Sequence, residues 1–353
     1  MGGELPIGTI GRMVELVDPA CTVREAARAE RGFCRVYRLL VETPERPREC
    51  YLKAAPEGAD AGVAADARIL AVLGEHTRIP VPDVLGTVDD HPDLPAPFYL
   101  MTPMPGSERP YEAVGRLPDD AVRTLADETG RYLGEAHLVD AVGSFGHVDR
   151  DPARPLDGDR PSGTVADLAV RDGCESWPTF LRTYVERELD RHAGSRFGHL
   201  TPRLRDWCGE RIGALSGPFS PVLGRNDHGL HNLLVDPDTG EVTAMLDWAY
   251  TLAVPPAFDL GFATYLYGGA FLAGLPGVRD RRHLVHEALS SGYREAAPGL
   301  ADTIRDRNPF YEVLAAVRVM NDFERLAPRL PDGTEGAVAD RIGADVGAML
   351  GDE

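Results

Sequence analysis

Three polar side chains, Asp227, Asn232 and Asp247, have the types and the spacing for chemistry on a phosphate group. An amide and a carboxylate offer hard oxygen ligands, which Mg²⁺ accepts while it completes its shell with water and phosphate oxygens. A carboxylate that precedes the amide by five residues can orient a hydroxyl group for attack on phosphorus. The order Asp, Asn, Asp along the chain is the order in which phosphoryl-transfer sites present these groups.

A β-hairpin is expected to bring two of these side chains together. Residues 233–235 and 242–246 have strand composition, and the turn between them contains a Pro that fixes φ and a Gly that supplies a positive φ. Asn232 enters the first strand and Asp247 leaves the second, so both lie at the same end of the hairpin. We therefore predict a Mg²⁺ site made by Asn232 and Asp247, with Asp227 in the loop that leads into it.

A competing interpretation of this segment is a transition-metal site of a metal-dependent hydrolase, built from Asp227, His228, His231 and Asp247. Two His residues at this spacing converge on a metal when a helix carries them. Gly229 lies between them and argues against a helix there. The spacing therefore favours Mg²⁺ and phosphate.

The chain has a single lysine, Lys53, which lies in a predicted strand. All other basic residues are arginine, so the retention of one lysine inside a strand suggests that the ammonium group itself is needed. Asp66 follows in a helical stripe with Val63, Leu70 and Leu73. A carboxylate in an apolar stripe is costly unless it is paired, so we predict an ion pair between Lys53 and Asp66. The alternative is an exposed Asp66 on a frayed helix.

The elements around these residues fall into two groups. Strands are predicted at 36–43, 49–54, 81–88 and 98–101, and a helix over 59–73. The run Thr102-Pro-Met-Pro-Gly106 breaks regular structure and is the predicted boundary between residues 1–105 and residues 106–353. The second part is mostly helical, with a long polar loop over 149–163 and helices expected at 119–138, 177–193, 201–215, 279–296 and 310–326. The fold class is therefore α+β, with a small antiparallel-sheet lobe and a large helical lobe.

Composition excludes several classes of protein. The 353 residues are 43% hydrophobic and 26% charged, which is ordinary for a globular chain with a large core, and no apolar run is long enough to span a membrane. The first residues lack the basic flank and apolar segment of a secretory signal. The five cysteines form no CxxC pair, so we expect reduced thiols in a cytoplasmic protein. A net charge of −19 argues against binding to nucleic acid. The acidic, arginine-rich composition suggests a halophilic source, with a GC-rich genome as the alternative.

The string Asp227-His-Gly-Leu-His-Asn-Leu-Leu-Val-Asp236, with Leu246-Asp-Trp248 after it, resembles the catalytic segment of the aminoglycoside phosphotransferase and choline kinase superfamily. The run Pro256-Ala-Phe-Asp-Leu260 is similar to that family's Pro-Ala-Tyr-Asp-Leu. The resemblance implies a protein-kinase-like two-lobed fold that binds ATP and Mg²⁺ and passes the γ-phosphate to a hydroxyl of a small molecule. Few residues separate Asp247 from Asp259, which leaves no room for a long activation segment and argues against a protein substrate.

The resemblance also implies individual roles. Asp227 is the implied catalytic base, Asn232 and Asp247 are the implied metal ligands, and Lys53 is expected to touch the α- and β-phosphates while it pairs with Asp66. The family more often has Glu at this last position.

Residues 98–106 resemble the hinge between the lobes, where the carbonyl of Thr102 and the N–H of Met104 are the implied contacts of adenine. The phosphate-covering loop is expected at 29–34, by position only. Asp259 is expected to brace the catalytic loop through backbone N–H groups.

One departure from the family pattern stands at the start of the catalytic loop. The chain has Arg225-Asn-Asp227 where the family usually has His-Gly-Asp, which could reshape the loop or place a cation near the phosphates. This change and Asp66 motivate the alternative of a catalytically silent nucleotide-binding regulatory protein. The expected acceptor is aminoglycoside-like, an amino alcohol or a sugar, with four candidate pocket residues in the helical lobe: Tyr265, Tyr267, Asp322 and Glu324.

Overall fold

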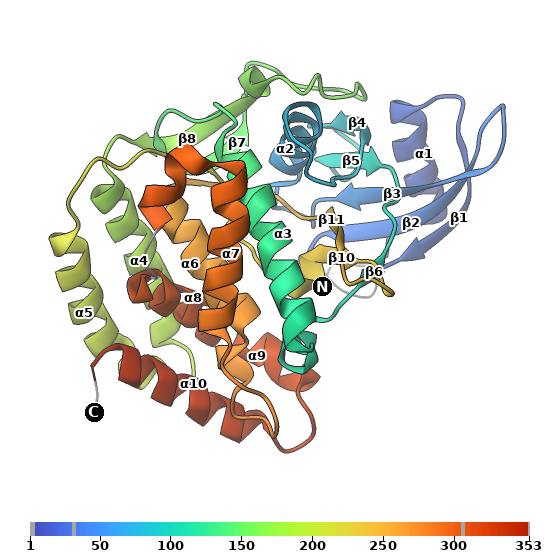
Figure 1. Cartoon of the computed structure of the whole chain (residues 1–353). Helices are drawn as coiled ribbons and strands as arrows, with labels where there is room; N and C mark the ends of the chain where they lie inside the picture. Colours follow the sequence, from blue (N-terminus) through green and yellow to red (C-terminus); the bar gives the residue numbers. More distant parts are fainter. Residues whose placement is uncertain (1–3, 30–32, 305–307, 352–353) are drawn as a thin grey trace.

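The N-terminal part of the protein is built on a five-stranded antiparallel sheet (Figure 1). The structure is a computed structural model and describes residues 4–29, 33–304 and 308–351. The strand order is β1-β2-β3-β5-β4, and the strands are β1 (Thr22–Arg28), β2 (Arg35–Glu42), β3 (Arg48–Ala54), β4 (Val84–Val88) and β5 (Phe98–Met101). Buried and more exposed residues alternate along β2, the period of a strand with one face in a core.

The two faces of this sheet belong to two different cores. Helix α1 (Ile7–Val17) covers one face and closes a small core that includes Phe98 and Leu100. Helix α2 (Val63–His76) lies against the other face, where Tyr99 points. The buried side chains of α2 and Tyr99 are part of the large core that continues through the helical part of the chain. Helix α2 therefore packs against its own sheet on one side and against strands of the C-terminal part on another.

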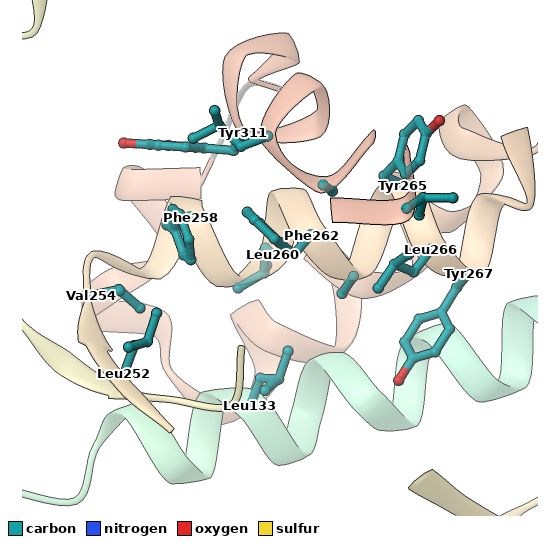
Figure 2. Packing of buried hydrophobic residues seen from close by; sticks show 14 of the residues in the cluster. Leu133, Leu252, Val254, Phe258, Leu260, Phe262, Tyr265, Leu266, Tyr267 and Tyr311 are labelled. Atoms are coloured by element: carbon teal, nitrogen blue, oxygen red, sulfur yellow. The ribbon is translucent and has the colours of Figure 1, made fainter. Parts of the chain in front are cut away.

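The C-terminal part is mostly helical. Helices α3 (Asp119–His137) and α7 (Arg282–Ala296) pack side by side (Figure 1). Helix α6 (Pro256–Gly268) is buried on all sides, and Figure 2 shows its Tyr265 and Tyr267 pointing in opposite directions, Tyr267 toward α3. The remaining helices are α4 (Trp177–Ala193), α5 (Thr201–Ala214), α8 (Pro309–Asn321), α9 (Phe323–Leu326) and α10 (Glu335–Met349). Short 3₁₀ helices lie at Tyr111–Arg116, Val165–Asp167, Gly198–Leu200, Leu230–Asn232, Ala270–Leu272, Pro298–Ile304 and Ala327–Arg329.

The C-terminal part also contains two small antiparallel sheets. In the first, the hairpin of β10 (Leu233–Val235) and β11 (Val242–Met245) is extended by β6 (Ser107–Glu108), which follows the hinge. The second has the order β8-β7-β12-β9 and contains β7 (Phe145–Arg150), β8 (Leu168–Cys174), β9 (Val222–Gly224) and β12 (Leu252–Val254). The chain between β7 and β8 leaves the helical part, passes over α2 toward β4, and returns (Figure 1).

The predicted fold class is confirmed, since a small antiparallel sheet precedes a large helical part. The helix predicted over 59–73 begins only at Val63, because Gly62 before it takes a left-handed conformation. The helix predicted over 310–326 is divided into α8 and α9. Helix α6 was not predicted, because a helix that is apolar all round has no periodic stripe. None of the helices in the described ranges has both the length and the apolar character to cross a membrane.

Candidate active site

The β10–β11 hairpin places Asn232 and Asp247 at one end, as the sequence predicts. Leu233 lies opposite Met245, and the N–H of Leu246 donates to the carbonyl of Asn232 at 2.8 Å. The side-chain amide of Asn232 is buried, and its nitrogen has no hydrogen-bond partner among the described residues. The Asp247 side chain is 44% exposed. An amide and a carboxylate of this kind suit a hard divalent cation such as Mg²⁺, so the residues fit that ion.

Lys53 joins the sheet of the small lobe to this hairpin. Its Nζ lies 2.5 Å from Oδ2 of Asp66 and 2.9 Å from Oδ1 of Asp247. Burial lowers the pKa of Lys53, but the carboxylates of Asp247 and Asp66 more than offset this and raise it well above its ordinary value. The side chain is therefore an ammonium at neutral pH. It connects the two carboxylates that the resemblance places beside the phosphates and the metal.

Asp66 is fully buried and accepts hydrogen bonds from two further groups. The hydroxyl of Tyr99 donates to Oδ2 at 2.7 Å, and the N–H of Trp248 donates to Oδ1 at 2.8 Å. With Lys53, these donors give each oxygen of the Asp66 carboxylate at least one partner, although the side chain is shorter than the usual Glu. The sequence did not indicate Tyr99. Its position opposite Lys53 in the β3–β5 register was the available signal, and it requires knowing that these strands pair.

Asp227 lies in a tight loop before the hairpin. Its N–H donates to the carbonyl of Arg225 at 2.8 Å, and its Oδ1 accepts from the N–H of Gly229 at 3.1 Å. Burial raises the pKa of Asp227, but the charges of Arg318 and His231 and the Gly229 hydrogen bond more than offset this and hold it below its ordinary value. Asp227 is therefore a carboxylate at neutral pH, which is the form that can accept a proton from a hydroxyl.

Asp259 braces this loop, as the resemblance implies. It is fully buried and accepts hydrogen bonds from the N–H groups of Arg225 at 2.8 Å and Asn226 at 2.9 Å. Nε2 of His228 lies 2.7 Å from Oδ1, and Nε2 of His137 lies 3.2 Å from Oδ2. Burial raises the pKa of Asp259, but the two His side chains and their hydrogen bonds hold it well below its ordinary value. The expected bracing role is confirmed, and both histidines belong to it.

Arg225 occupies the position where the family usually has His. Its side chain is buried, its Nε donates to the carbonyl of Asp227 at 2.8 Å, and its Nη2 donates to the carbonyls of Asn232 at 3.1 Å and Leu246 at 2.7 Å. The guanidinium also lies 5.0 Å from the ring centroid of Trp248. Arg225 thus clamps the base loop to both strands of the metal hairpin. Its Nε and Nη2 serve backbone carbonyls, which is a structural role for the departure from the family pattern, while its Nη1 is buried without a hydrogen-bond partner among the described residues.

Arg318 from α8 supports the same loop from the helical side. Its Nη1 donates to the carbonyl of Asn226 at 2.9 Å and to Oδ1 of Asn226 at 2.8 Å. Asn226 has a φ of +66°, a left-handed conformation that costs energy for a residue with a side chain. Arg318 therefore pins the strained residue that precedes Asp227. The sequence did not indicate this arginine, which is one of many and lies 91 residues further along the chain.

The hinge residues lie beside the hairpin. The N–H of Thr102 donates to the carbonyl of Asp83 at 2.9 Å, and Oγ1 of Thr243 on β11 donates to the carbonyl of Pro105 at 2.7 Å. Within the described ranges, the Thr102 carbonyl and the Met104 N–H make no hydrogen bond, so both are free to meet a ligand. The predicted phosphate-covering loop at 29–34 includes residues 30–32, which lie outside the described residues.

Two of the four candidate acceptor residues do not line a surface. Tyr265 and Tyr267 are buried in the core around α6 (Figure 2), because that helix has no solvent-facing side. Asp322 and Glu324 are exposed in part and pair with arginines of α4 and the segment after it.

The competing transition-metal interpretation has no support in the described residues. The ring of His228 is hydrogen-bonded to Asp259, and these residues contain no cluster of three His, Cys, Asp or Glu side chains suited to a metal.

Comparisons with known proteins give a family and a fold. Residues 35–298 match the model of the phosphotransferase enzyme family. A Ralstonia eutropha JMP134 protein, provisionally assigned as an aminoglycoside phosphotransferase, aligns with a TM-score of 0.58 at 16% identity over 98% of this chain and 96% of that chain. A thermostable mutant of aminoglycoside phosphotransferase APH(4)-Ia, in its apo form, gives 0.57 at 13% identity over 97% and 100%. The GDP complex of aminoglycoside 2'-phosphotransferase-IIIa gives 0.57 at 14% identity over 98% and 99%.

At these identities the solved structures show a shared fold only. The match to the family model shows the relationship of this chain to the family. The resemblance seen in the sequence is confirmed. The chain belongs to the phosphotransferase enzyme family and is a small-molecule kinase with that family's two-lobed architecture.

Proposed function

We propose that this protein transfers the γ-phosphate of ATP to a hydroxyl group of a small molecule in a Mg²⁺-dependent reaction, with the nucleotide between a lobe of residues 1–105 and a lobe of residues 106–353. The observation that carries the proposal is the contact of Lys53 with both Asp66 and Asp247. It joins a strand of the small lobe to the hairpin 194 residues away. The ammonium of Lys53 lies beside the residues suited to a metal, and a bound triphosphate needs both positive charges, that of the ammonium and that of the metal ion.

The proposed roles follow from the chemistry of each group. Asp227 accepts the proton of the acceptor hydroxyl as its oxygen bonds to the γ-phosphorus, the bond from that phosphorus to the bridging oxygen breaks, and ADP leaves. Lys53 holds the α- and β-phosphates. Asn232 and Asp247 would hold Mg²⁺, which neutralises charge on the phosphates when bound.

Adenine is proposed to pair with the hinge. Its amino group donates to the Thr102 carbonyl, and a ring nitrogen accepts from the Met104 N–H, both of which are free of hydrogen bonds in the described residues. Related structures contain ADP or GDP, which supports a nucleotide in this fold.

The acceptor is proposed to be a hydroxylated small molecule such as an aminosugar, an amino alcohol or a sugar. Solved proteins of this fold are complexes with hygromycin B or with kanamycin. The ionised Asp227 and the intact Lys53–Asp66 pair favour an active enzyme over a silent nucleotide-binding protein.

ADP release from MgATP, measured with a panel of aminoglycosides, amino alcohols and sugars, tests the proposal. At least one acceptor should raise ADP release above the background, mass spectrometry should find that acceptor phosphorylated, and Asp227→Ala should abolish the increase. Tight MgATP binding with no ADP release for any acceptor, and none in its absence, would favour the silent alternative.

A further inference from the structure

The segment of residues 151–163, here called the strap, ties the helical part of the protein to the edge of the small-lobe sheet. It begins after β7 and ends before β8, both in the four-stranded sheet of the helical part. Along β4, the N–H of Thr87 donates to the carbonyl of Asp159 at 3.0 Å, and the N–H of Gly158 donates back to Thr87 at 2.8 Å. The N–H of Asp89 donates to Leu156 at 2.9 Å. The strap therefore covers the edge strand as an added strand would.

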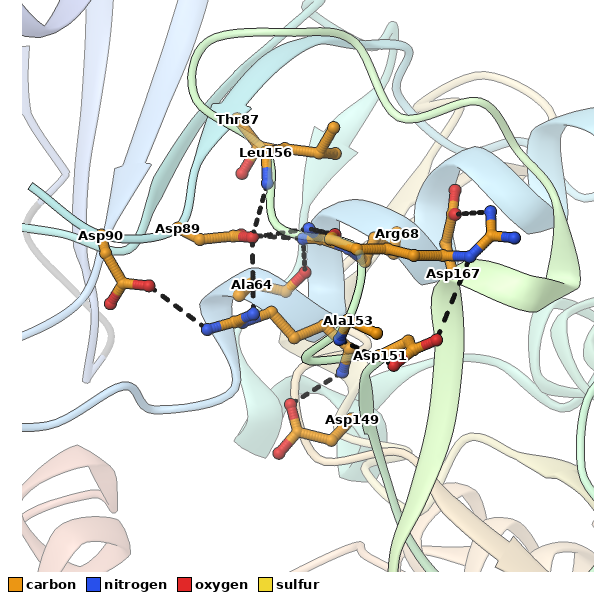
Figure 3. Close-up of polar contacts among 12 residues, drawn as sticks. Ala64, Arg68, Thr87, Asp89, Asp90, Asp149, Asp151, Ala153, Leu156 and Asp167 are labelled. Carbon is orange, nitrogen blue, oxygen red and sulfur yellow. Dashed lines mark hydrogen bonds and ion pairs between the residues drawn. The ribbon is translucent and has the colours of Figure 1, made fainter.

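A buried ion pair lies where the strap meets α2 (Figure 3). Arg68 of α2 forms two parallel bonds with Asp89, Nη1 to Oδ1 at 2.9 Å and Nη2 to Oδ2 at 2.7 Å, and both side chains are almost fully buried. Nη2 of Arg68 also donates to the carbonyl of Arg154 at 3.1 Å, and the N–H of Leu156 donates to Oδ2 of Asp89 at 2.9 Å. Arg68 and Asp89 each bind both the other and the strap, so the strap completes the pair.

The same helix carries Asp66, two residues before Arg68. Asp66 must reach Lys53, Tyr99 and the N–H of Trp248, with each distance between 2.5 and 2.8 Å. The side chain is short, so its reach depends on where the helix lies. A displacement of about 1 Å directly away from any one of these partners would lengthen that distance to about 3.5 Å or more, beyond the usual hydrogen-bonding range. The position of α2 therefore decides whether the Lys53–Asp66 pair can form.

We propose that the strap is a positioning device for nucleotide binding: through Arg68 and Asp89 it holds α2 where Asp66 meets Lys53, before any nucleotide is bound. The part of this inference that concerns phosphates rests on the proposed function, because it assigns Lys53 to them. Arg68 and Asp89 are positioning residues that act through Asp66. The protein would then need no closing movement of α2 to assemble its phosphate site.

Paired variants separate positioning from general stability. Arg282 of α7 is a matched control, because it is also buried and its Nη2 lies 2.7 Å from Asp345, in the helical part of the chain. The first pair, Arg68→Met and Arg282→Met, removes a buried guanidinium from each site. The second and milder pair, Arg68→Lys and Arg282→Lys, keeps the positive charge but loses the planar guanidinium. Two measurements are made on the full chain: hydrogen exchange of the α2 amides without nucleotide, and calorimetric affinity for MgAMP-PNP.

We expect the Arg68 variants to speed exchange in α2 by about tenfold or more and to weaken MgAMP-PNP binding by about tenfold, since local opening and a small misplacement both act at this level. The Arg282 variants should leave both readouts near wild type. If Arg68→Lys matches Arg282→Lys in both measurements, the proposal is wrong. Wild-type protein that binds no nucleotide would instead contradict the proposed function, and the exchange data would still judge the strap.

Discussion

Replacing Arg225 by Met tests the clamp between the base loop and the metal hairpin. The substitution removes the donors to the carbonyls of Asp227, Asn232 and Leu246. The Asn232 carbonyl keeps the N–H of Leu246, whereas the other two carbonyls have no further partner among the described residues. Both carbonyls are part-buried, so each one left without a donor should cost the lower end of the range of about 1–3 kcal/mol, and we expect a loss of about 2 kcal/mol in the free energy of unfolding. That is an appreciable part of the roughly 5–15 kcal/mol that stabilises a typical protein.

Arg225→His refines the test, because it installs the residue usual in the family. A neutral imidazole donates one hydrogen bond, so it can satisfy one of the two carbonyls, and we expect a loss about half as large. Guanidinium-induced unfolding, followed by fluorescence, should rank wild type above Arg225→His and Arg225→Met last. Arg205→Met is the control, since Arg205 forms ion pairs on the surface, which contribute little.

The second readout is the stabilisation that MgATP gives. Ligand at about 100 times its dissociation constant should stabilise the wild-type protein by about 2.7 kcal/mol. The gain should shrink in Arg225→Met, because the strands that carry Asn232 and Asp247 lose their common anchor. An unfolding midpoint for Arg225→Met that coincides with that of wild type would refute the clamp.

Lys53→Arg should keep the fold but lower activity by about 10²-fold, because a planar guanidinium cannot replace a compact ammonium between two carboxylates. An ATP-mimicking acyl phosphate should label Lys53 in the wild-type protein unless MgATP is present. Near-normal activity of Lys53→Arg would remove Lys53 from the site. Arg318→Met should move the acid limb of the kcat profile to higher pH, because burial raises the pKa of Asp227 and the charge of Arg318 is the first of the influences that offset it. Activity is lost as pH falls through that pKa, so superimposable profiles would show that Arg318 does not set the charge state of the base. Asp247→Ala should lower the affinity for MgATP, measured by calorimetry, more than Asn232→Ala does, because the carboxylate contributes a full charge to the cation. Equal, mild losses of affinity in the two variants would argue against a metal at this end of the hairpin.

The local parts of the site were predictable from the sequence because they depend on short-range geometry. A turn with its own Pro and Gly fixes the hairpin register, and the register fixes which end Asn232 and Asp247 share. The apolar stripe around Asp66 required a cation, and the chain offers one lysine. The braces from Asp259 came from the family resemblance. Each of these inferences used residue types that are distinctive at their positions.

The rest could not be predicted, because the interactions join distant segments through groups that every residue has. The sequence predicts only a long polar loop at the strap. Its bonds to β4 and Asp89 use backbone atoms, which composition does not reveal. Arg318 is one arginine among many until α8 packs beside Asn226. The tyrosines of α6 were assigned to a surface because the pattern gave no sign that every face of that helix is buried.

The most direct test of the account is to measure binding and turnover together in Asp227→Asn. The substitution keeps the shape of the side chain and removes its charge, while Asn232, Asp247 and Lys53 are untouched. MgATP affinity by calorimetry should stay within about threefold of wild type, and turnover with the acceptor found in the screen should fall by about 10²–10⁴-fold, the range for loss of a positioned base. Turnover within about threefold of wild type at unchanged affinity would contradict the assignment of Asp227, and with it the proposed mechanism.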